Sequence, residues 1–365
     1  MSPEVTVLMP VFNGEKYLRE SIESILNQSY TDIEFLIIDD GSNDLSQEII
    51  RSYTDPRIVL LTNEKNQGLP ICLNSGLEIA KGRYIARMDH DDISLPLRLE
   101  KQLGIMEQFK DVMMVGCWYD IIDIDTNRWT HHGIKNKKEK IEKALLIGKV
   151  PFPHGCMMFR TNLLERTGCY NEDFIFSQDF ELLLRIFQRN RIYVLEEILF
   201  QLRKQPVSRL KKMNQMDLNN IALSIYHSVR PQPYHVHAVK SIKKNFQSQN
   251  KNEKVTKKEW ASYFFNMGNN AARRGEKNKA IEYYMRGYKN SSASGMLKFF
   301  IGMIILLLPE CINKYIINIP QAFRLTKYNR DNNRDINIKE SRMVSSFFNY
   351  LIELARNENF IIFIN

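Results

Sequence analysis

The chain has 365 residues, of which 44% are hydrophobic and 25% charged, and it carries a net charge of +9. These values exclude a largely disordered chain, and the length suits a catalytic domain joined to an accessory region. The charge is uneven, because residues 1–205 hold 25 Lys and Arg against 31 Asp and Glu, whereas residues 206–365 hold 26 against 11.

Short apolar runs alternate with helical periodicity through the first 110 residues. Strands are predicted at 5–9, 35–38, 58–61 and 84–88, and helices at 17–26, 45–53, 68–80 and 95–109. Fully apolar strands that alternate with helices predict an α/β fold, a mostly parallel sheet with helices on both faces. Ligands bind beyond the carboxyl ends of such strands. Polar clusters around Asn13, Asp39 and Asp89 fall at those ends, so we expect the site there.

The pattern becomes less regular from residue 111. Strands are predicted at 112–118, 129–134 and 157–159, with one or two more in 192–202, and helices at 136–149 and 179–188. A domain boundary is predicted near 205–206. It separates a catalytic domain, 1–205, with halves 1–110 and 111–205, from a basic and mainly helical region, 206–365. Within that region, residues 260–291 are similar to a single tetratricopeptide-type helix pair.

Three carboxylates occur within four residues at Asp89, Asp91 and Asp92, directly after a predicted strand. Carboxylates so close together repel one another unless a positive charge lies among them. Mg²⁺ or Mn²⁺ held by one or two carboxylates and by substrate phosphates is a common arrangement. The alternative is an acidic turn in which Asp92 caps the next helix. The cluster alone does not decide between these interpretations.

Five segments in one order lead to a resemblance that covers the first 205 residues. They are residues 5–15, which end in Pro-Val-Phe-Asn-Gly-Glu, residues 37–44 with Asp-Asp-Gly-Ser, and the segments 66–68, 74–76 and 86–92. Together they resemble a family 2 glycosyltransferase with the GT-A fold, the group that builds bacterial surface polysaccharides. The resemblance implies a Rossmann-like nucleotide-binding sheet and says nothing direct about the C-terminal region.

The resemblance implies a role for several residues in binding a nucleoside diphosphate sugar. Asp39 would accept a hydrogen bond from the base, which favours uridine or thymidine over adenine. The 66–68 loop would approach the ribose, with a plain turn as the alternative, and Arg87 would counter phosphate charge or pair with nearby acids. The residues implied in nucleotide binding are Pro10, Val11, Asn13, Glu15, Asp39, Asn66, Gly68, Arg87 and Asp89.

The resemblance also implies where the metal and the chemistry would lie. Asp89 and Asp91 match the DxD pattern that holds ribose and Mn²⁺ or Mg²⁺. Asp179 corresponds to the general base of an inverting transfer, with a helix cap as the alternative. Gln178 replaces the acidic residue that usually precedes this base, which removes a neighbour that could raise the pKa of Asp179. His154 would lie on the acceptor side or be a plain loop residue, and Arg203 would belong to a loop that covers the diphosphate.

These assignments predict an inverting, metal-dependent glycosyltransferase that uses a nucleoside diphosphate sugar, UDP favoured, and a saccharide or lipid-linked saccharide acceptor. A non-catalytic nucleotide-sugar binder or assembly scaffold is the alternative. A nucleotidyltransferase is disfavoured because no Gly-rich loop with a basic residue follows the first strand. A dinucleotide oxidoreductase is disfavoured because GxGxxG is missing there.

The basic region has its own predictions. Its charge and the ten-residue apolar stretch 299–308 favour docking on an anionic membrane surface, since ten residues are too few to span a bilayer. A basic scaffold for a homodimer is the alternative, and nucleic acid is not expected because no reader motif occurs. Scattered cysteines suit a reducing compartment. We therefore expect a cytoplasmic protein, peripheral at the inner face of the cell membrane.

Overall fold

The computed structural model describes residues 2–207, 209–227, 233–249 and 255–291, with the single positions 299, 302 and 306. Contacts group Met1–Gly295 into one compact unit and Met296–Asn365 into a second. The predicted membrane-docking stretch 299–308 lies outside the described residues except for those three positions. In the part of the chain that is described, no helix is long and apolar enough to cross a membrane.

One nine-stranded sheet, in the order β3-β2-β1-β4-β8-β6-β9-β5 with β7 added to β6, organises the first two hundred residues. Four strands are parallel, namely β1 (Val5–Val11), β2 (Ile33–Asp39), β3 (Ile58–Thr62) and β4 (Tyr84–Arg87). The chain order reverses between β1 and β4, and such a switch point is where ligands bind in open α/β sheets. The predicted α/β, GT-A-type fold class is therefore confirmed.

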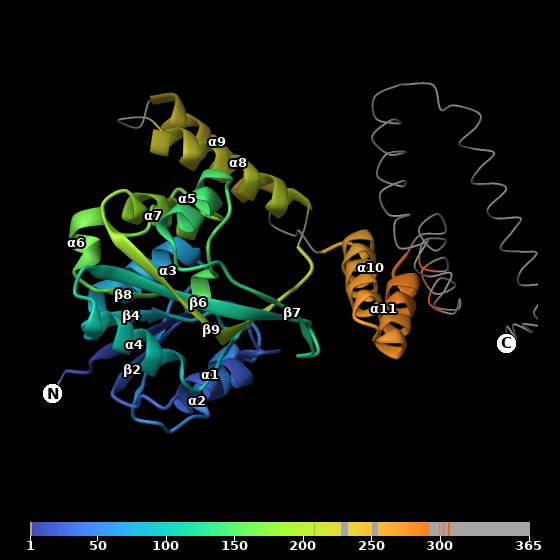
Figure 1. The fold of residues 1–365 in the computed structure, drawn as a ribbon, viewed down its shortest axis with the longest axis horizontal. Coiled ribbons are helices and arrows are strands. Elements are labelled where there is room, and N and C mark those ends of the chain that lie inside the picture. Colours follow the sequence, from blue (N-terminus) through green and yellow to red (C-terminus); the bar gives the residue numbers. More distant parts are fainter. Residues whose placement is uncertain are drawn as a thin grey trace, which may run out of the picture. The chain divides into compact units, whose positions relative to one another are not determined.

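The second half of the sheet is mixed. Its strands are β5 (Ile93–Ser94), β6 (Val112–Ile122), β7 (Arg128–His132), β8 (Met158–Arg160) and β9 (Arg191–Arg203). Strand β8 is antiparallel to β4 and β6, whereas β6 and β9 are parallel and run side by side (Figure 1). The predicted closing strands are one long strand, β9. The two-residue β5 leaves no pattern in the sequence and was not predicted.

Seven helices accompany the sheet in residues 2–207. They are α1 (Leu18–Leu26), α2 (Ser46–Arg51), α3 (Leu69–Ile79), α4 (Arg98–Gln108), α5 (Lys138–Leu146), α6 (Leu163–Thr167) and α7 (Gln178–Phe187). The periodicity behind these predictions is clear in α7, where Phe180, Leu183, Leu184 and Phe187 recur on one face and are all buried. Only α6, at five residues, was not predicted.

Four helices follow β9 in the described part of the basic region: α8 (Arg209–His227), α9 (Pro233–Gln249), α10 (Lys257–Arg273) and α11 (Lys277–Lys289). Helices α10 and α11 form the predicted hairpin. A Cβ at Gly268 would lie 2.4 Å from the Tyr284 ring, so glycine permits this close packing. The four helices belong to the same compact unit as the sheet, and the domain boundary near 205 stays a prediction.

Candidate functional site

Asp39 ends β2 and has one carboxylate oxygen without a partner. Its side chain is fully buried, and Oδ2 accepts hydrogen bonds from Gln47 Nε2 (2.7 Å) and from the Ser42 amide (3.3 Å). Oδ1 is buried and has no partner among the described residues. A buried acceptor left in this way costs about 1–3 kcal/mol. The arrangement is chemically suited to an incoming N–H donor, as predicted for the nucleotide base.

The loop after β1 is fastened to the loop after β2. Asn13 has a positive φ of 51°, and its Oδ1 accepts from the Asn43 amide (3.0 Å). Glu15 accepts from the Leu45 amide (3.0 Å). Pro10 and Val11 are buried in β1, in register with Ile38 and Asp39 of β2. The polar side chains thus hold the shape of this rim, and direct contacts of these four residues with a nucleotide stay predictions.

Hydrogen bonds to Asp40 anchor the 66–68 loop. The buried carboxylate of Asp40 accepts from the amides of Gln67 and Gly68, both at 2.9 Å. Gly68 has a φ of 98°, which glycine adopts without strain, and Asn66 is exposed. The loop is therefore a well-anchored turn at the strand ends, and an approach of Asn66 or Gly68 to ribose remains a prediction.

Arg87 and Asp89 form an ion pair at the end of β4. Of the two partners predicted for Arg87, phosphate or a nearby acid, the structure shows the acid. Burial, the largest single influence, would raise the pKa of Asp89, but the positive charge of Arg87, its hydrogen bond to Asp89 and smaller contributions from His154 and His90 together hold that pKa below its ordinary value. Asp89 is thus ionised at neutral pH. A Cβ at Gly14 would lie 2.6 Å from His90 Cδ2, so glycine lets the acidic loop pack against the β1 loop.

Asp92 is buried beside Asp89 and does not cap a helix. Its Oδ1 accepts from the Arg203 amide (2.7 Å), and its Oδ2 has no partner in the described part of the chain. Burial, followed by the charges of Asp91 and Asp89, raises the pKa of Asp92 well above its ordinary value. A Cβ at Gly155 would lie 2.9 Å from Asp89 Oδ2 and 3.2 Å from Asp92 Oδ2. Both carboxylates therefore face the same glycine.

The acidic loop has the ligand chemistry of a divalent-cation site. Asp91 Oδ2 accepts from Gln205 Nε2 (2.6 Å), and its other oxygen accepts no hydrogen bond from the residues that the structure describes. Among the residues described, no group of three His, Cys, Asp or Glu forms a ready-made metal cluster. Mg²⁺ commonly takes only one or two carboxylates and completes its shell with substrate phosphates and water. The oxygens of Asp89 and Asp91 fit that mode of binding.

Asp179 lies in the first turn of α7. Ser177 occupies the N-cap position, and Asp179 Oδ1 accepts from the Phe180 amide (2.8 Å), so the alternative of a helix cap is wrong. Burial raises the pKa of Asp179 to about 6, and the charge of Asp89 adds to the increase. Gln178 brings no negative charge to this position, as predicted from the sequence, but burial and Asp89 raise the pKa without it.

His154 belongs to the same charged cluster. Its Nε2 lies 2.8 Å from Tyr170 Oη, and Asn74 holds Tyr170 in place through two 3.0 Å backbone hydrogen bonds. Burial and the charge of Arg87 lower the pKa of His154 to about 3, so the imidazole is neutral at pH 7. The charges of Arg87 and Asp89 act on both His154 and Asp179. The end of β4 and the start of α7 therefore lie within electrostatic reach of each other.

A cavity of about 320 Å³ opens beside Asp179. Helix α8 supplies part of its wall, which the sequence did not predict, because nothing in a basic helix indicates where it packs. Ser177 Oγ donates to the Gln215 carbonyl (3.2 Å), and Asn219 Nδ2 donates to the Gly148 carbonyl (3.2 Å). The cavity is lined by Tyr119, Gly148, Lys149, Val150, Asp179, Phe180, Gln215 and Asn219.

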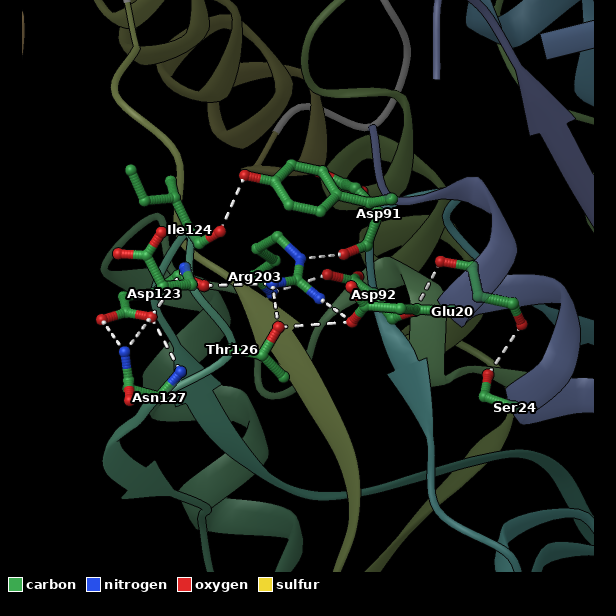
Figure 2. Close-up of polar contacts among 12 residues, drawn as sticks. Glu20, Ser24, Asp91, Asp92, Asp123, Ile124, Thr126, Asn127 and Arg203 are labelled. Carbon is green, nitrogen blue, oxygen red and sulfur yellow. Dashed lines mark hydrogen bonds and ion pairs between the residues drawn. The ribbon is translucent and has the colours of Figure 1, made fainter. Parts of the chain in front are cut away.

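Arg203 lies beside Asp91 and Asp92 of the acidic loop (Figure 2) and is buried. Its buried guanidinium donates to the Asp91 carbonyl (2.8 Å) and to Thr126 Oγ1 (2.8 Å), and it pairs with Glu20 (2.8 Å). The group also lies 4.1 Å from the centre of the Tyr17 ring. The predicted placement of Arg203 on a covering loop is therefore wrong, because the residue ends β9 and is buried. Arg203 instead joins the acidic loop, α1 and the β6–β7 turn.

The chain is similar in sequence to known proteins. The family model "Glycosyl transferase family 2" matches residues 6–168. An uncharacterized glycosyltransferase of Methanocaldococcus jannaschii is 36% identical over 219 residues, which cover 58% of this chain and 75% of the relative. A Bacillus subtilis protein named as a glycosyltransferase, EpsE, is 33% identical over 62% of this chain and 82% of its own length. A solved structure of S. aureus TarS with UDP-GlcNAc matches with a TM-score of 0.49 and 14% identity, covering 83% of this chain and 90% of that one.

Proposed function

We propose, from the premise that this chain belongs to glycosyl transferase family 2 and is a glycosyltransferase, that it catalyses an inverting, metal-dependent sugar transfer. The donor would be a nucleoside diphosphate sugar, and the acceptor a saccharide or lipid-linked saccharide of cell-surface polysaccharide synthesis. The observation that carries the proposal is Asp179, whose pKa is raised to about 6 at the wall of a cavity and within electrostatic reach of Asp89.

The donor would bind along the ends of β1, β2 and β4. The unpartnered Oδ1 of Asp39 would accept the N–H of a uracil or thymine base, which supports UDP as the favoured nucleotide. Asp91 and Asp89 would hold Mn²⁺ or Mg²⁺. Such a cation, when bound, neutralises charge that develops on a departing diphosphate. Because Arg87 is paired with Asp89, its part would be to hold that carboxylate ionised and in place.

Asp179 would act as the general base. Its carboxylate takes the proton of the acceptor hydroxyl while that oxygen forms a bond to the anomeric carbon. The bond from the anomeric carbon to the phosphate oxygen breaks, and its electron pair leaves with the diphosphate. Attack from the side opposite the leaving group inverts the anomeric centre. A pKa of about 6 leaves Asp179 mainly ionised at pH 7 and still basic enough to take the proton.

The basic region would place the enzyme at an anionic surface. The excess of Lys and Arg in residues 206–365 supports peripheral association with the cytoplasmic face of a membrane, with each basic residue near the surface contributing about 1 kcal/mol. A homodimer scaffold is the alternative. Sedimentation with anionic vesicles at low salt tests this, since a protein that stays in the supernatant has no such association.

Thermal unfolding with nucleotides separates the enzyme from a non-catalytic scaffold. UDP, dTDP, GDP and ADP are each added with and without Mn²⁺ to the full chain. A ligand at a hundred times its Kd stabilises by about 2.7 kcal/mol, which raises Tm by several degrees. We expect UDP or dTDP with Mn²⁺ to give this increase, and Asp91→Asn to abolish it.

The matched control is Asp111→Asn, because Asp111 is exposed directly before β6 and forms a surface ion pair with Arg191. This variant should keep the Mn²⁺-dependent increase in Tm. If no nucleotide raises Tm, the proposal fails in favour of a scaffold. If nucleotides bind but NMR shows no transfer product with any saccharide acceptor, the chain is a nucleotide-sugar binder.

A further inference from the structure

A second cavity, of about 400 Å³, lies away from Asp179, between the α10–α11 hairpin and the catalytic domain. Its volume falls within the range of small-ligand sites. It is lined by Lys16 from the loop after β1, by Trp260 and Phe264 of α10, and by Arg286 and Lys289 of α11. None of these residues has a part in the proposed transfer reaction.

The frame of this cavity is fixed by contacts between the hairpin and the β6–β7 turn. Tyr283 Oη donates a hydrogen bond to the Asp123 carboxylate, and the Ile124 amide donates to Tyr263 Oη (3.2 Å). Arg286 forms an ion pair with Asp125. Tyr263 and Tyr283 are both buried. The walls are therefore held in place, so a ligand need not order them on binding.

The cavity carries an excess of positive charge. Arg286 is balanced by Asp125 and by Glu282, 3.7 Å away. Lys16 and Lys289 are exposed, and neither forms an ion pair with any residue that the structure describes. Two ammonium groups thus remain available at the rim, where they favour an anionic ligand.

One wall of the cavity is aromatic. Trp260 stacks on Phe264, with ring centres 5.6 Å apart and an angle of 25° between the planes, and the Arg286 guanidinium lies 4.7 Å from the Phe264 centre. Such stacking fixes the orientation of the rings. Flat apolar rings beside cationic groups match an acidic or phosphorylated sugar, which has a face of C–H groups and carries its carboxylate or phosphate at the edge of the ring.

We propose that this cavity binds an anionic saccharide, with sugar rings against Trp260 and a carboxylate or phosphate at Lys16 and Lys289. The choice of a saccharide rests on the proposed function, in which this site would hold a growing acceptor chain outside the catalytic cavity. Lys16 directly follows Glu15, and the Asp123 carbonyl accepts from Arg203, which also binds the acidic loop. The cavity thus adjoins the donor side of the molecule.

Calorimetric titration of the full chain without donor nucleotide tests the proposal. The probes are hexagalacturonate, a phosphorylated maltohexaose, neutral maltohexaose and inorganic polyphosphate. We expect at least one of the two organic anions to bind, and maltohexaose to bind at least tenfold more weakly. Lys289→Glu should weaken binding of that anion at least tenfold, and Trp260→Leu, which keeps an apolar side chain, at least fivefold. The preferred organic anion identifies the charged group.

Lys277→Glu is the matched control, because Lys277 is exposed on α11, lies outside the cavity lining and gives the same change of charge. It should change binding less than twofold. Equal losses of affinity in Lys277→Glu and Lys289→Glu would overturn the proposal in favour of general electrostatics. The same conclusion would follow if polyphosphate bound, if no saccharide bound, and if Trp260→Leu left the affinity for polyphosphate unchanged. Binding of anionic phosphatidylglycerol vesicles alone, lost in Lys289→Glu, would assign the surface to membrane. Because no donor is present, these results are independent of whether the transfer reaction is correct.

Discussion

Two Asp-x-Asp sequences lie near each other in this molecule and differ in how completely they are hydrogen-bonded. Asp123, the first residue of the Asp123–Asp125 pair, accepts from the amides of Asp125 (2.9 Å) and Asn127 (2.8 Å), from Asn127 Nδ2 and from Tyr283. In the Asp89–Asp91 loop, Asp92 keeps one buried oxygen without a described partner. A buried carboxylate that accepts all its hydrogen bonds stabilises the fold. One that lacks a hydrogen-bond donor lowers the stability unless a ligand supplies that donor. The two sequences therefore share a motif but differ in how completely their buried carboxylates are hydrogen-bonded.

The largest expected effect is at Asp179, the proposed general base, which lies within electrostatic reach of Asp89. Asp179→Asn removes the proton acceptor, so we expect kcat to fall by roughly 10²–10⁴-fold. The nucleotide Kd from calorimetry should stay within twofold of the parent, since Asp179 would contact the acceptor. Asp173→Asn, at an acid of the same segment that pairs with Lys243, should leave kcat within about twofold. A small loss of kcat in Asp179→Asn would remove Asp179 as the base.

Asp123→Asn tests the fully hydrogen-bonded carboxylate of the comparison. One oxygen is replaced by an amide donor that faces donors from Asn127 or Tyr283, so buried groups lose their partners. We expect the free energy of unfolding to fall by about 1–3 kcal/mol, with kcat little changed at a temperature where the protein is folded. Chemical denaturation measures the first quantity. A large loss of kcat without any loss of stability would break the comparison, because Asp123 would then be functional.

The pH dependence sharpens the assignment of Asp179. The base must be deprotonated to act, so kcat/KM should rise with pH through a midpoint of about 6 and fall tenfold per unit below it. The same raised pKa means that the folded protein binds more protons than the unfolded chain between about 3.8 and about 6. Asp179 therefore lowers the stability progressively as pH rises through that window. A pH-rate profile that is flat from 5 to 7 would contradict the assignment.

Asp39→Asn tests an acid with one hydrogen-bonded oxygen and one oxygen without a described partner, in contrast to the fully hydrogen-bonded Asp123. The asparagine oxygen is needed by Gln47 and Ser42, so its amide group would face the base N–H as a second donor. We expect the Kd for UDP to rise about tenfold, which corresponds to 1.4 kcal/mol. The Tm of the free protein should change by less than in Asp123→Asn. Unchanged UDP affinity would show that the open oxygen of Asp39 does not meet the base.

The smallest effect is expected for a substitution of Arg203, which connects the Asp89–Asp91 loop to the turn that contains Asp123 and Thr126. Arg203→Lys keeps the charge but not the planar group that reaches Asp91, Thr126 and Glu20 together. We expect the Mn²⁺ concentration for half-maximal activity to rise several-fold, with kcat at saturating Mn²⁺ near the parent value. Arg191→Lys, at an exposed pair with Asp111, is the control. A fall in Tm with no change in Mn²⁺ activation would limit Arg203 to a structural role.

Much of the first half of the molecule was predictable because its signals are local. The apolar runs of β1, β2, β3 and β4 and the helices between them can each be recognised from a short window of sequence. The order of these strands in the sheet was not predicted and comes from the tertiary structure. The helical pair of α10 and α11 was predictable for the same reason. The two-residue β5 was not, because its pairing with β9 joins residues more than a hundred positions apart.

The sequence by itself determined the fold class, the family resemblance and the acids that end β2 and β4, since these depend on residue type and on spacing along the chain. Only the tertiary structure decided which acids are satisfied, because their donors come from distant segments. Arg203 and Glu20 are 183 positions apart, and Asp123 and Tyr283 are 160 apart. Burial, which raises the pKa of Asp179 and hides Arg203, is likewise a property of packing. No pattern along the chain records which side chains surround a given carboxylate.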